Sequence, residues 1–272
     1  MDHLKFFLGI GLAVVIVFAG ASVYAHYAKS GSAPVPADHD TLYQVSTIDA
    51  LMLGVYDGIT PIRVLKNRGD FGIGTFDALD GEMIVLDGVV YQVKADGRIL
   101  SVPDNLTTPF ATVTHFEADR NITAKAPMDL SIFTTSMEEQ LPTGNMIYAV
   151  RMHGTFPFMK VRSVPAQQEP YQVLSEAVKN QSVYTFSGTT GTIVGFHTPV
   201  FFKGVNVPGF HLHYLSDDRK AGGHILDFTL PAGTLVEYDI TPGFTMALPT
   251  SGDFTGANLS QDLSSDLAKV EK

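Results

Sequence analysis

Short apolar segments, some alternating with polar residues, are separated by glycine, proline and aspartate along most of the chain. The clearest pattern covers residues 81–93, where two runs rich in Val, Ile and Leu flank Asp87-Gly88. Asp-Gly favours a two-residue turn, so a β-hairpin is predicted here. Further strands are predicted over residues 112–116, 145–156, 159–164, 182–187, 190–196, 200–202 and 234–240. Helical spacing of apolar residues predicts helices over residues 47–56, 131–140 and 171–180.

These elements predict a β-rich α+β protein with two β-sheet-centred domains and a few helices. The Pro- and Gln-containing stretch at residues 165–170 is the predicted boundary. It separates an N-terminal sheet domain, residues 41–165, from a C-terminal sheet domain, residues 166–250. Residues 251–272 then form a polar, acidic tail.

Two arginines interrupt apolar strands on the N-terminal side of that boundary. Residues 145–156 and 159–164 are predicted to pair as a hairpin, and they contain Arg151 and Arg162. An arginine in such a strand forms one half of an ion pair or extends its charge to the sheet edge. Its guanidinium fork also matches a carboxylate, so either residue is a candidate anion ligand.

The N-terminus is predicted to carry an export signal or a membrane anchor, and a buried core helix is the alternative. Residues 6–25 contain no charged side chain and are long enough to span a bilayer as a helix. Lys5 before the run and Val23-Tyr24-Ala25 at its end also fit a secretory signal peptide. Both interpretations predict an exported protein, secreted or periplasmic, or one anchored through residues 6–25. Residues 26–40 are predicted to be a flexible linker.

Composition excludes several other functions. The net charge is −10 without a basic patch, so nucleic acid is not a predicted partner. Cysteine is absent, which excludes disulfides and thiolate ligands. Gly72 and Gly74 form only Gly-x-Gly, so a dinucleotide fingerprint is not supported. These glycines are instead predicted to allow close backbone approach or a bulge.

Three histidines near residue 215 form a candidate metal site. His211 and His213 are two residues apart, which places both imidazoles on one face of a strand. The polar, glycine-rich residues 216–223 predict a loop that returns His224 on the next strand. Three imidazoles suit zinc and other divalent transition metals, and they leave a coordination position open. A solvated pair of histidines is the alternative.

Four stretches, at residues 70–76, 79–84, 162–165 and 209–228, together resemble the α-acetolactate decarboxylase family. The resemblance extends in order and spacing over roughly residues 41–271. It implies a carboxy-lyase that converts 2-acetolactate to acetoin and CO2 with Zn²⁺, through a metal-stabilised enediolate. It also implies an α+β fold with two sheet-containing domains, and a homodimer.

The resemblance assigns roles to seven residues. The zinc ligands fall on His211, His213 and His224. A pocket Glu falls on Glu82, whose other interpretation is a solvated charge at a strand edge. The remaining roles fall on Thr75 in the pocket, on Arg162 as catalytic residue and carboxylate ligand, and on Glu271 as a tail carboxylate that folds into the site, with Asp266 as its alternative.

Two other functions remain open at this point. The same three histidines can serve another zinc enzyme, such as a hydrolase with Glu82 as general base. They can also belong to an exported, non-catalytic metal-binding module. Structural zinc usually has four protein ligands, and Asp217 or Asp227 would then supply the fourth.

Overall fold

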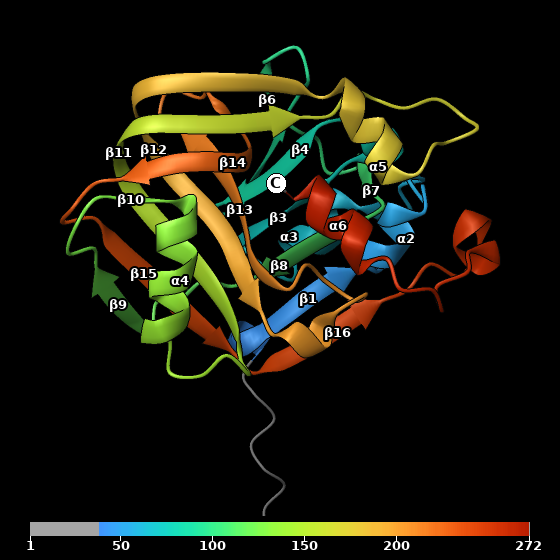
Figure 1. Cartoon of the computed structure of the whole chain (residues 1–272). Helices are drawn as coiled ribbons and strands as arrows, with labels where there is room; N and C mark the ends of the chain where they lie inside the picture. The colour runs from blue at the N-terminus through green and yellow to red at the C-terminus, as the bar shows by residue number, and fades with distance from the viewer. Residues whose placement is uncertain (1–37, 272) are drawn as a thin grey trace, which may run out of the picture. The chain divides into compact units, whose positions relative to one another are not determined.

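The structure, a computed structural model, describes residues 38–271 and contains two seven-stranded β-sheets (Figure 1). The strand order is β16-β1-β8-β3-β4-β5-β6 in the first sheet and β10-β14-β13-β12-β11-β15-β9 in the second. β1 and β16 pair in parallel, and the other pairs in both sheets are antiparallel. The predicted sheet-dominated α+β class is therefore observed.

The strands and helices have the following bounds. The first sheet comprises β1 (Thr41–Val45), β3 (Phe71–Thr75), β4 (Glu82–Leu86), β5 (Val89–Val93), β6 (Ile99–Ser101), β8 (Ala111–Thr114) and β16 (Gly243–Ala247). The second comprises β9 (Arg120–Thr123), β10 (Met128–Asp129), β11 (Ile147–Ser163), β12 (Ser182–Thr198), β13 (Gly209–Ser216), β14 (Gly222–Leu230) and β15 (Leu235–Thr241). A small ladder joins β2 (Thr60–Pro61) to β7 (Thr107–Thr108). The α-helices are α2 (Ile48–Met52), α3 (Ile62–Lys66), α4 (Leu130–Gln140), α5 (Leu174–Ala177) and α6 (Ser264–Val270). The 3₁₀ turns are η1 (Asp38–Asp40), η2 (Asp77–Leu79), η3 (Val178–Asn180), η4 (Val200–Phe202) and η5 (Gly252–Gly256).

Local sequence explains the elements that were predicted correctly. Asp87 and Gly88 have φ angles of 51° and 75°, as a primed turn between β4 and β5 requires. α4 matches the helix predicted over residues 131–140. In α2 the Thr47 side chain accepts a hydrogen bond from the Ala50 backbone N–H, which caps the first turn.

Three strand predictions are wrong. Residues 182–187 and 190–196, predicted as two strands, belong to the single strand β12. Residues 145–164 do not form a hairpin, because β11 runs unbroken through Pro157 and pairs along its length with β12. Pro157 is tolerated because it lies between the pairs Phe156–Thr189 and Phe158–Ser187, where the register gives it no partner. The predicted strand at residues 200–202 is instead the 3₁₀ turn η4, which follows Pro199.

The boundary predicted at residues 165 and 166 does not separate the two sheets. β11 and β12 lie on either side of it and are neighbours in the second sheet, while β16 returns from the C-terminal region to the first sheet. The proline-containing stretch is thus a connection between adjacent strands. Residues 38–271 belong to one compact unit.

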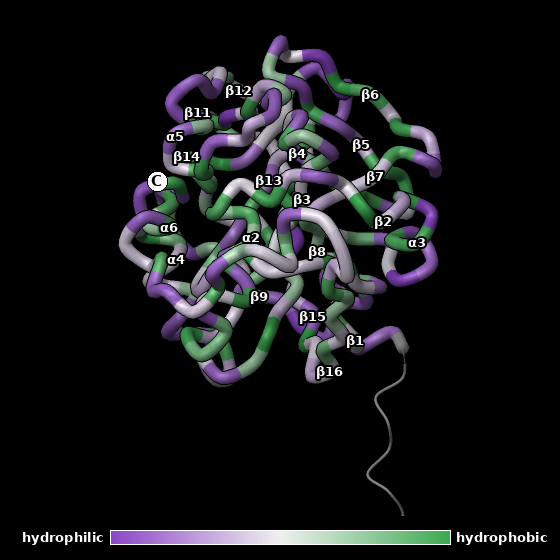
Figure 2. Tube along the Cα trace, turned by 90° about the vertical axis from the view of Figure 1, so that its right-hand side faces the viewer, coloured by the Kyte–Doolittle hydropathy of each residue, from purple (hydrophilic) through white to green (hydrophobic). Residues whose placement is uncertain are grey.

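The two sheets pack face to face through one shared apolar cluster. It includes buried residues from the first sheet, Leu42, Phe71, Ile73, Ile84, Leu86 and Val93, and from the second, Ile147, Ala149, Val194, Phe196 and Leu215. Figure 2 shows that hydrophilic segments are concentrated in the outer loops. This packing fixes the distance between β4 and the β13–β14 pair, which together carry the candidate site.

The predicted signal or anchor at residues 1–25 and the linker up to residue 37 lie outside the described residues. The last linker residues, 38–40, form η1. Within residues 38–271, none of the helices has the length and apolar character needed to cross a membrane.

A substitution at Gly72 tests whether β3 approaches β8 closely. A Cβ on Gly72 would overlap the Thr112 carbonyl oxygen and lie 2.6 Å from Val113 Cγ1. This confirms the predicted close approach. We expect Gly72→Ala to lower the free energy of unfolding by about 2 kcal/mol, because overpacking moves the β8 backbone. Urea unfolding measures the change.

The matched control is Gly144→Ala. No atom of the described residues lies within 4 Å of a Cβ built on Gly144. Its unfolding midpoint should stay near that of the parent protein. Equal midpoints for the two variants would contradict the packing argument.

Candidate active site

Three histidines converge between the sheets, as their spacing predicted. His213 and His224 lie directly opposite each other on β13 and β14, and His211 precedes His213 by two residues on the same face. One potential ligand atom from each lies within 4.8 Å of the others. His213 and His224 are fully buried, and the side chain of His211 is only 11% exposed. The alternative of a solvated pair is therefore excluded.

The other sheet orients His213. Its Nδ1 lies 2.9 Å from the Met83 carbonyl oxygen on β4. A carbonyl only accepts hydrogen bonds, so Nδ1 carries the proton and the Nε2 lone pair is free. Among the described residues, His213 Nε2 and His224 Nε2 are buried without a hydrogen-bond partner. His211 Nε2 lies 3.1 Å from His224 Nδ1.

Burial keeps the three imidazoles neutral. It lowers the pKa of His211 to about 3, and the positive charge of Arg162 adds to the effect. Burial is also the main reason that the pKa values of His213 and His224 lie well below their ordinary value. Neutral imidazoles are the form that binds metals. A buried, neutral triad with two unpartnered nitrogens therefore fits a divalent transition metal.

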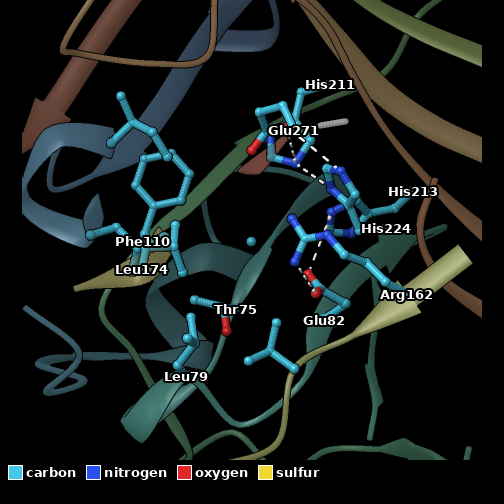
Figure 3. A pocket seen from close by; sticks show the side chains of 14 residues that line it. Thr75, Leu79, Glu82, Phe110, Arg162, Leu174, His211, His213, His224 and Glu271 are labelled. Atoms are coloured by element: carbon cyan, nitrogen blue, oxygen red, sulfur yellow. Dashed lines mark hydrogen bonds and ion pairs between the residues drawn. The ribbon is translucent and has the colours of Figure 1, made fainter. Parts of the chain in front are cut away.

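Glu82 and Arg162 form the next part of the site (Figure 3). Glu82 Oε1 lies 3.4 Å from Arg162 Nη1, and both side chains are almost fully buried. Burial raises the pKa of Glu82 to about 7, although the charge of Arg162 opposes the rise. Glu82 is therefore not a solvated charge at a strand edge. Arg162 Nε is buried without a partner in the described part of the chain, so it can still bind an anion.

The C-terminal tail folds onto this pocket. Glu271 Oε2 lies 3.6 Å from His224 Nε2 and 3.9 Å from His211 Nε2, and burial raises the pKa of Glu271 to about 7. Leu267 and Val270 on α6 are buried in an apolar cluster. Burial of each of these two side chains stabilises the docked tail by about 2 kcal/mol, which is more than an exposed ion pair contributes to stability. Apolar burial therefore holds the tail in place.

Thr75 lies opposite Glu82 on paired strands and also lines the pocket. Its hydroxyl donates to the Gly81 carbonyl oxygen at 2.7 Å. With its proton used there, the Thr75 oxygen can act towards a ligand only as an acceptor.

The three carboxylates that sequence analysis offered as alternatives lie elsewhere. Asp217 pairs with His153 on the surface, and Asp227 accepts a hydrogen bond from the Phe228 backbone N–H. Asp266 pairs with Lys269 on the exposed side of α6. In the described residues, the histidine cluster therefore gains no fourth ligand from Asp217 or Asp227.

An apolar wall completes the pocket, and sequence analysis assigned it no role. Its residues come from α2, η2, α5 and the loops between strands, and all of them belong to the cluster that covers the tail: Ile48, Leu51, Leu79, Phe110, Val164 and Leu174. Figure 3 shows Leu79, Phe110 and Leu174 on one side, with the histidines, Arg162 and Glu82 on the other. A ligand with one polar side and one apolar side fits this pocket.

Comparison with known proteins identifies the family of the chain. The sequence model of the alpha-acetolactate decarboxylase family matches residues 42–261. The chain belongs to this family. The alpha-acetolactate decarboxylase of Methanosarcina mazei is 54% identical over 233 residues, which are 86% of this chain and 81% of that protein. The Brevibacillus brevis family member is 40% identical over 257 residues, which are 92% of this chain and 89% of that protein.

Solved structures of this family share the fold. The crystal structure of the Bacillus subtilis strain 168 alpha-acetolactate decarboxylase has a TM-score of 0.82 and 38% identity, covering 85% of this chain and 99% of that one. A Staphylococcus aureus protein of unknown function, similar to alpha-acetolactate decarboxylase, has a TM-score of 0.80 and 32% identity, covering 85% and 100%. Family membership confirms the resemblance and makes the chain a carboxy-lyase.

The hydrogen bond between the sheets predicts a single tautomer for His213. Long-range ¹H–¹⁵N spectra of metal-free protein should show His213 protonated at Nδ1 and neutral at pH 6, because its pKa is lowered by burial. The ¹⁵N signals should remain those of a neutral imidazole as the pH falls through 6.5, the ordinary pKa of histidine. An Nε2–H tautomer would contradict the assigned contact with Met83.

Proposed function

We propose that the chain decarboxylates 2-acetolactate to acetoin and CO2 with Zn²⁺ bound by His211, His213 and His224. The composition of the pocket is the observation that supports this proposal most directly. A buried, neutral histidine triad lies beside an arginine with an unused donor and two carboxyls whose pKa values are near 7. Family membership supports the reaction, because the relatives carry the name of this activity.

The donor set suits zinc. Three neutral imidazole nitrogens and no thiolate match the three-ligand arrangement of catalytic zinc. Zinc, when bound, supplies a Lewis acid that stabilises negative charge on substrate oxygens. The contact of His213 Nδ1 with the Met83 carbonyl would fix the orientation of that ligand.

Arg162 is proposed to bind and orient the substrate carboxylate. Its Nε has no partner among the residues described, and its Nη1 is only loosely held by Glu82 at 3.4 Å. A firm grip on the carboxylate would stabilise the ground state and slow the loss of CO2. Its benefit is therefore orientation of the breaking C–C bond next to the ketone.

A carboxyl group then has to deliver a proton. When CO2 leaves, the electron pair of the broken bond stays on carbon and delocalises onto the adjacent ketone as an enediolate. Protonation of that carbon gives acetoin. Glu82 and Glu271 are both proposed donors, since a carboxyl with a pKa of about 7 is partly protonated at neutral pH.

We further propose that residues 1–25 export the protein or anchor it, with membrane contact only through that segment, and that the chain forms a homodimer. The uncharged run at residues 6–25 supports the first proposal. Sequencing the N-terminus of protein isolated from cell fractions tests it. Light scattering tests the second.

The test of function is acetoin formation from racemic 2-acetolactate by the full chain and by His213→Ala. We expect the variant to lose zinc and activity together, because two imidazoles hold zinc weakly. His153→Ala is the control, since that histidine is exposed and paired with Asp217. Full activity in zinc-free His213→Ala would refute the ligand assignment.

Arg162→Ala should keep its zinc and lose at least about a hundredfold in kcat/KM, as expected when a positioning group is removed. Steady-state kinetics and metal analysis measure the two effects. Arg151→Ala is the matched control, because Arg151 lies in the same strand and pairs with Glu237 instead. Unchanged kinetics in Arg162→Ala would make Arg162 a structural residue.

Glu82→Gln should retain zinc but show slower decarboxylation or acetoin of reduced enantiomeric purity. Chiral chromatography of the product reports the face that is protonated. Glu271→Gln tests the second donor, with Asp266→Asn on the exposed side of the tail helix as control. Normal rate and chirality in both glutamine variants would show that the acid lies elsewhere.

A further inference from the structure

Two adjacent residues in the pocket region have a backbone conformation that favours glycine. Ala78 and Leu79 both have a φ of 58°. A residue with a Cβ adopts this left-handed region only at an energetic cost, because its Cβ comes too close to the following carbonyl oxygen. Such backbone strain gathers at functional sites when the surrounding structure enforces it. The Ala78–Leu79 turn is therefore a place to look for function.

Three backbone hydrogen bonds hold this turn. The Ala78 N–H donates to the Tyr56 carbonyl oxygen at 2.9 Å, and the Ala78 carbonyl oxygen accepts from the Gln167 N–H at 2.8 Å. The Leu79 carbonyl oxygen accepts from the Gly81 N–H at 2.9 Å. Tyr56 and Gln167 belong to two other segments of the chain, so the turn is held from outside as well as by its own Gly81 contact.

The side chain of Leu79 faces the pocket. Leu79 is 4% exposed and lines the cavity together with Glu82, Arg162 and the histidines. In Figure 3 it lies on the apolar side, near Thr75 and across from Arg162. Glycine at this position would relieve the strain and remove this part of the wall. The strained leucine thus places a branched apolar side chain at a point of the wall that glycine would leave empty.

The chemistry of the substrate gives this wall a role. 2-Acetolactate carries a carboxylate, a hydroxyl and a ketone, and its remaining groups are two methyls. When the oxygens face Arg162 and the histidines, the methyls face the apolar wall. We propose that the Ala78–Leu79 turn, through the Leu79 side chain, limits the size of the alkyl group that the site admits. This inference rests on the proposed function.

The test compares substrates that differ by one methylene group. The probes are 2-acetolactate, its homologue with ethyl in place of methyl on the carbinol carbon, and its homologue with propanoyl in place of acetyl. One methylene in an apolar pocket changes kcat/KM about 10–200-fold. In Leu79→Gly, we expect kcat/KM for at least one homologue, relative to 2-acetolactate, to rise about tenfold. In Leu79→Gly the relief of backbone strain offsets part of the stability lost with a buried leucine side chain, and Leu79→Ala tests the pocket without a glycine.

Two further variants separate pocket size from general loosening. Leu79→Ala keeps a Cβ and should shift the same ratio in the same direction. Met52→Ala opens space in the same apolar cluster, but Met52 is not among the residues that line the pocket. Its ratio should stay within about twofold of the parent value. All variants are compared at equal zinc content.

The outcomes are distinct. Unchanged ratios for both homologues in Leu79→Gly and Leu79→Ala, with 2-acetolactate still turned over, would overturn the inference. An equal shift in Met52→Ala would also overturn it, because the effect would then come from loosening. If the parent protein forms no acetoin, the proposed function fails before any variant is compared.

Discussion

The hydrogen bond between His213 and the Met83 carbonyl connects the two sheets at the point where the chemistry is placed. It depends on the apolar packing of the sheets, because that packing sets β4 against β13. Two consequences follow from one contact. The tautomer of His213 is fixed with its free nitrogen towards the cluster, and Glu82, the residue before Met83, is carried into the same pocket.

The buried pocket then sets the electrostatics of the site. Removal from water disfavours every charged form, so the histidines stay neutral and the pKa values of Glu82 and Glu271 rise to about 7. The positive charge of Arg162 opposes this rise in the pKa of both carboxyls. The same burial therefore supplies metal-binding nitrogens and carboxyls able to give up a proton. The docked tail helix is what encloses Glu271 in this environment.

Local sequence patterns predicted part of this arrangement. The period of a strand and the loop after Ser216 were enough to place the three histidines together. Contacts between the sheets have no local pattern, so the roles of Glu82 and Glu271 followed only from the family resemblance. The strand pattern offered Arg151 and Arg162 equally as anion ligands, and only the resemblance chose Arg162. The sequence predicted a break in β11 after residue 156, because it does not show that the register leaves Pro157 without a partner. The left-handed Ala78–Leu79 turn gives no signal, since neither residue favours that conformation.

The alternative of a non-catalytic metal module requires a closed, four-ligand zinc site. Asp217 and Asp227, its candidate fourth ligands, lie away from the histidines. Arg162 lies in the same pocket as the three histidines, and its Nε has no partner among the described residues, which favours binding of a small carboxylate.

The most direct measurement is the rate of acetoin formation from racemic 2-acetolactate by the wild-type chain as purified, after chelation, and after Zn²⁺ is restored. The account predicts activity that is lost with the metal and regained with zinc. Undiminished activity in protein shown to be metal-free would contradict it.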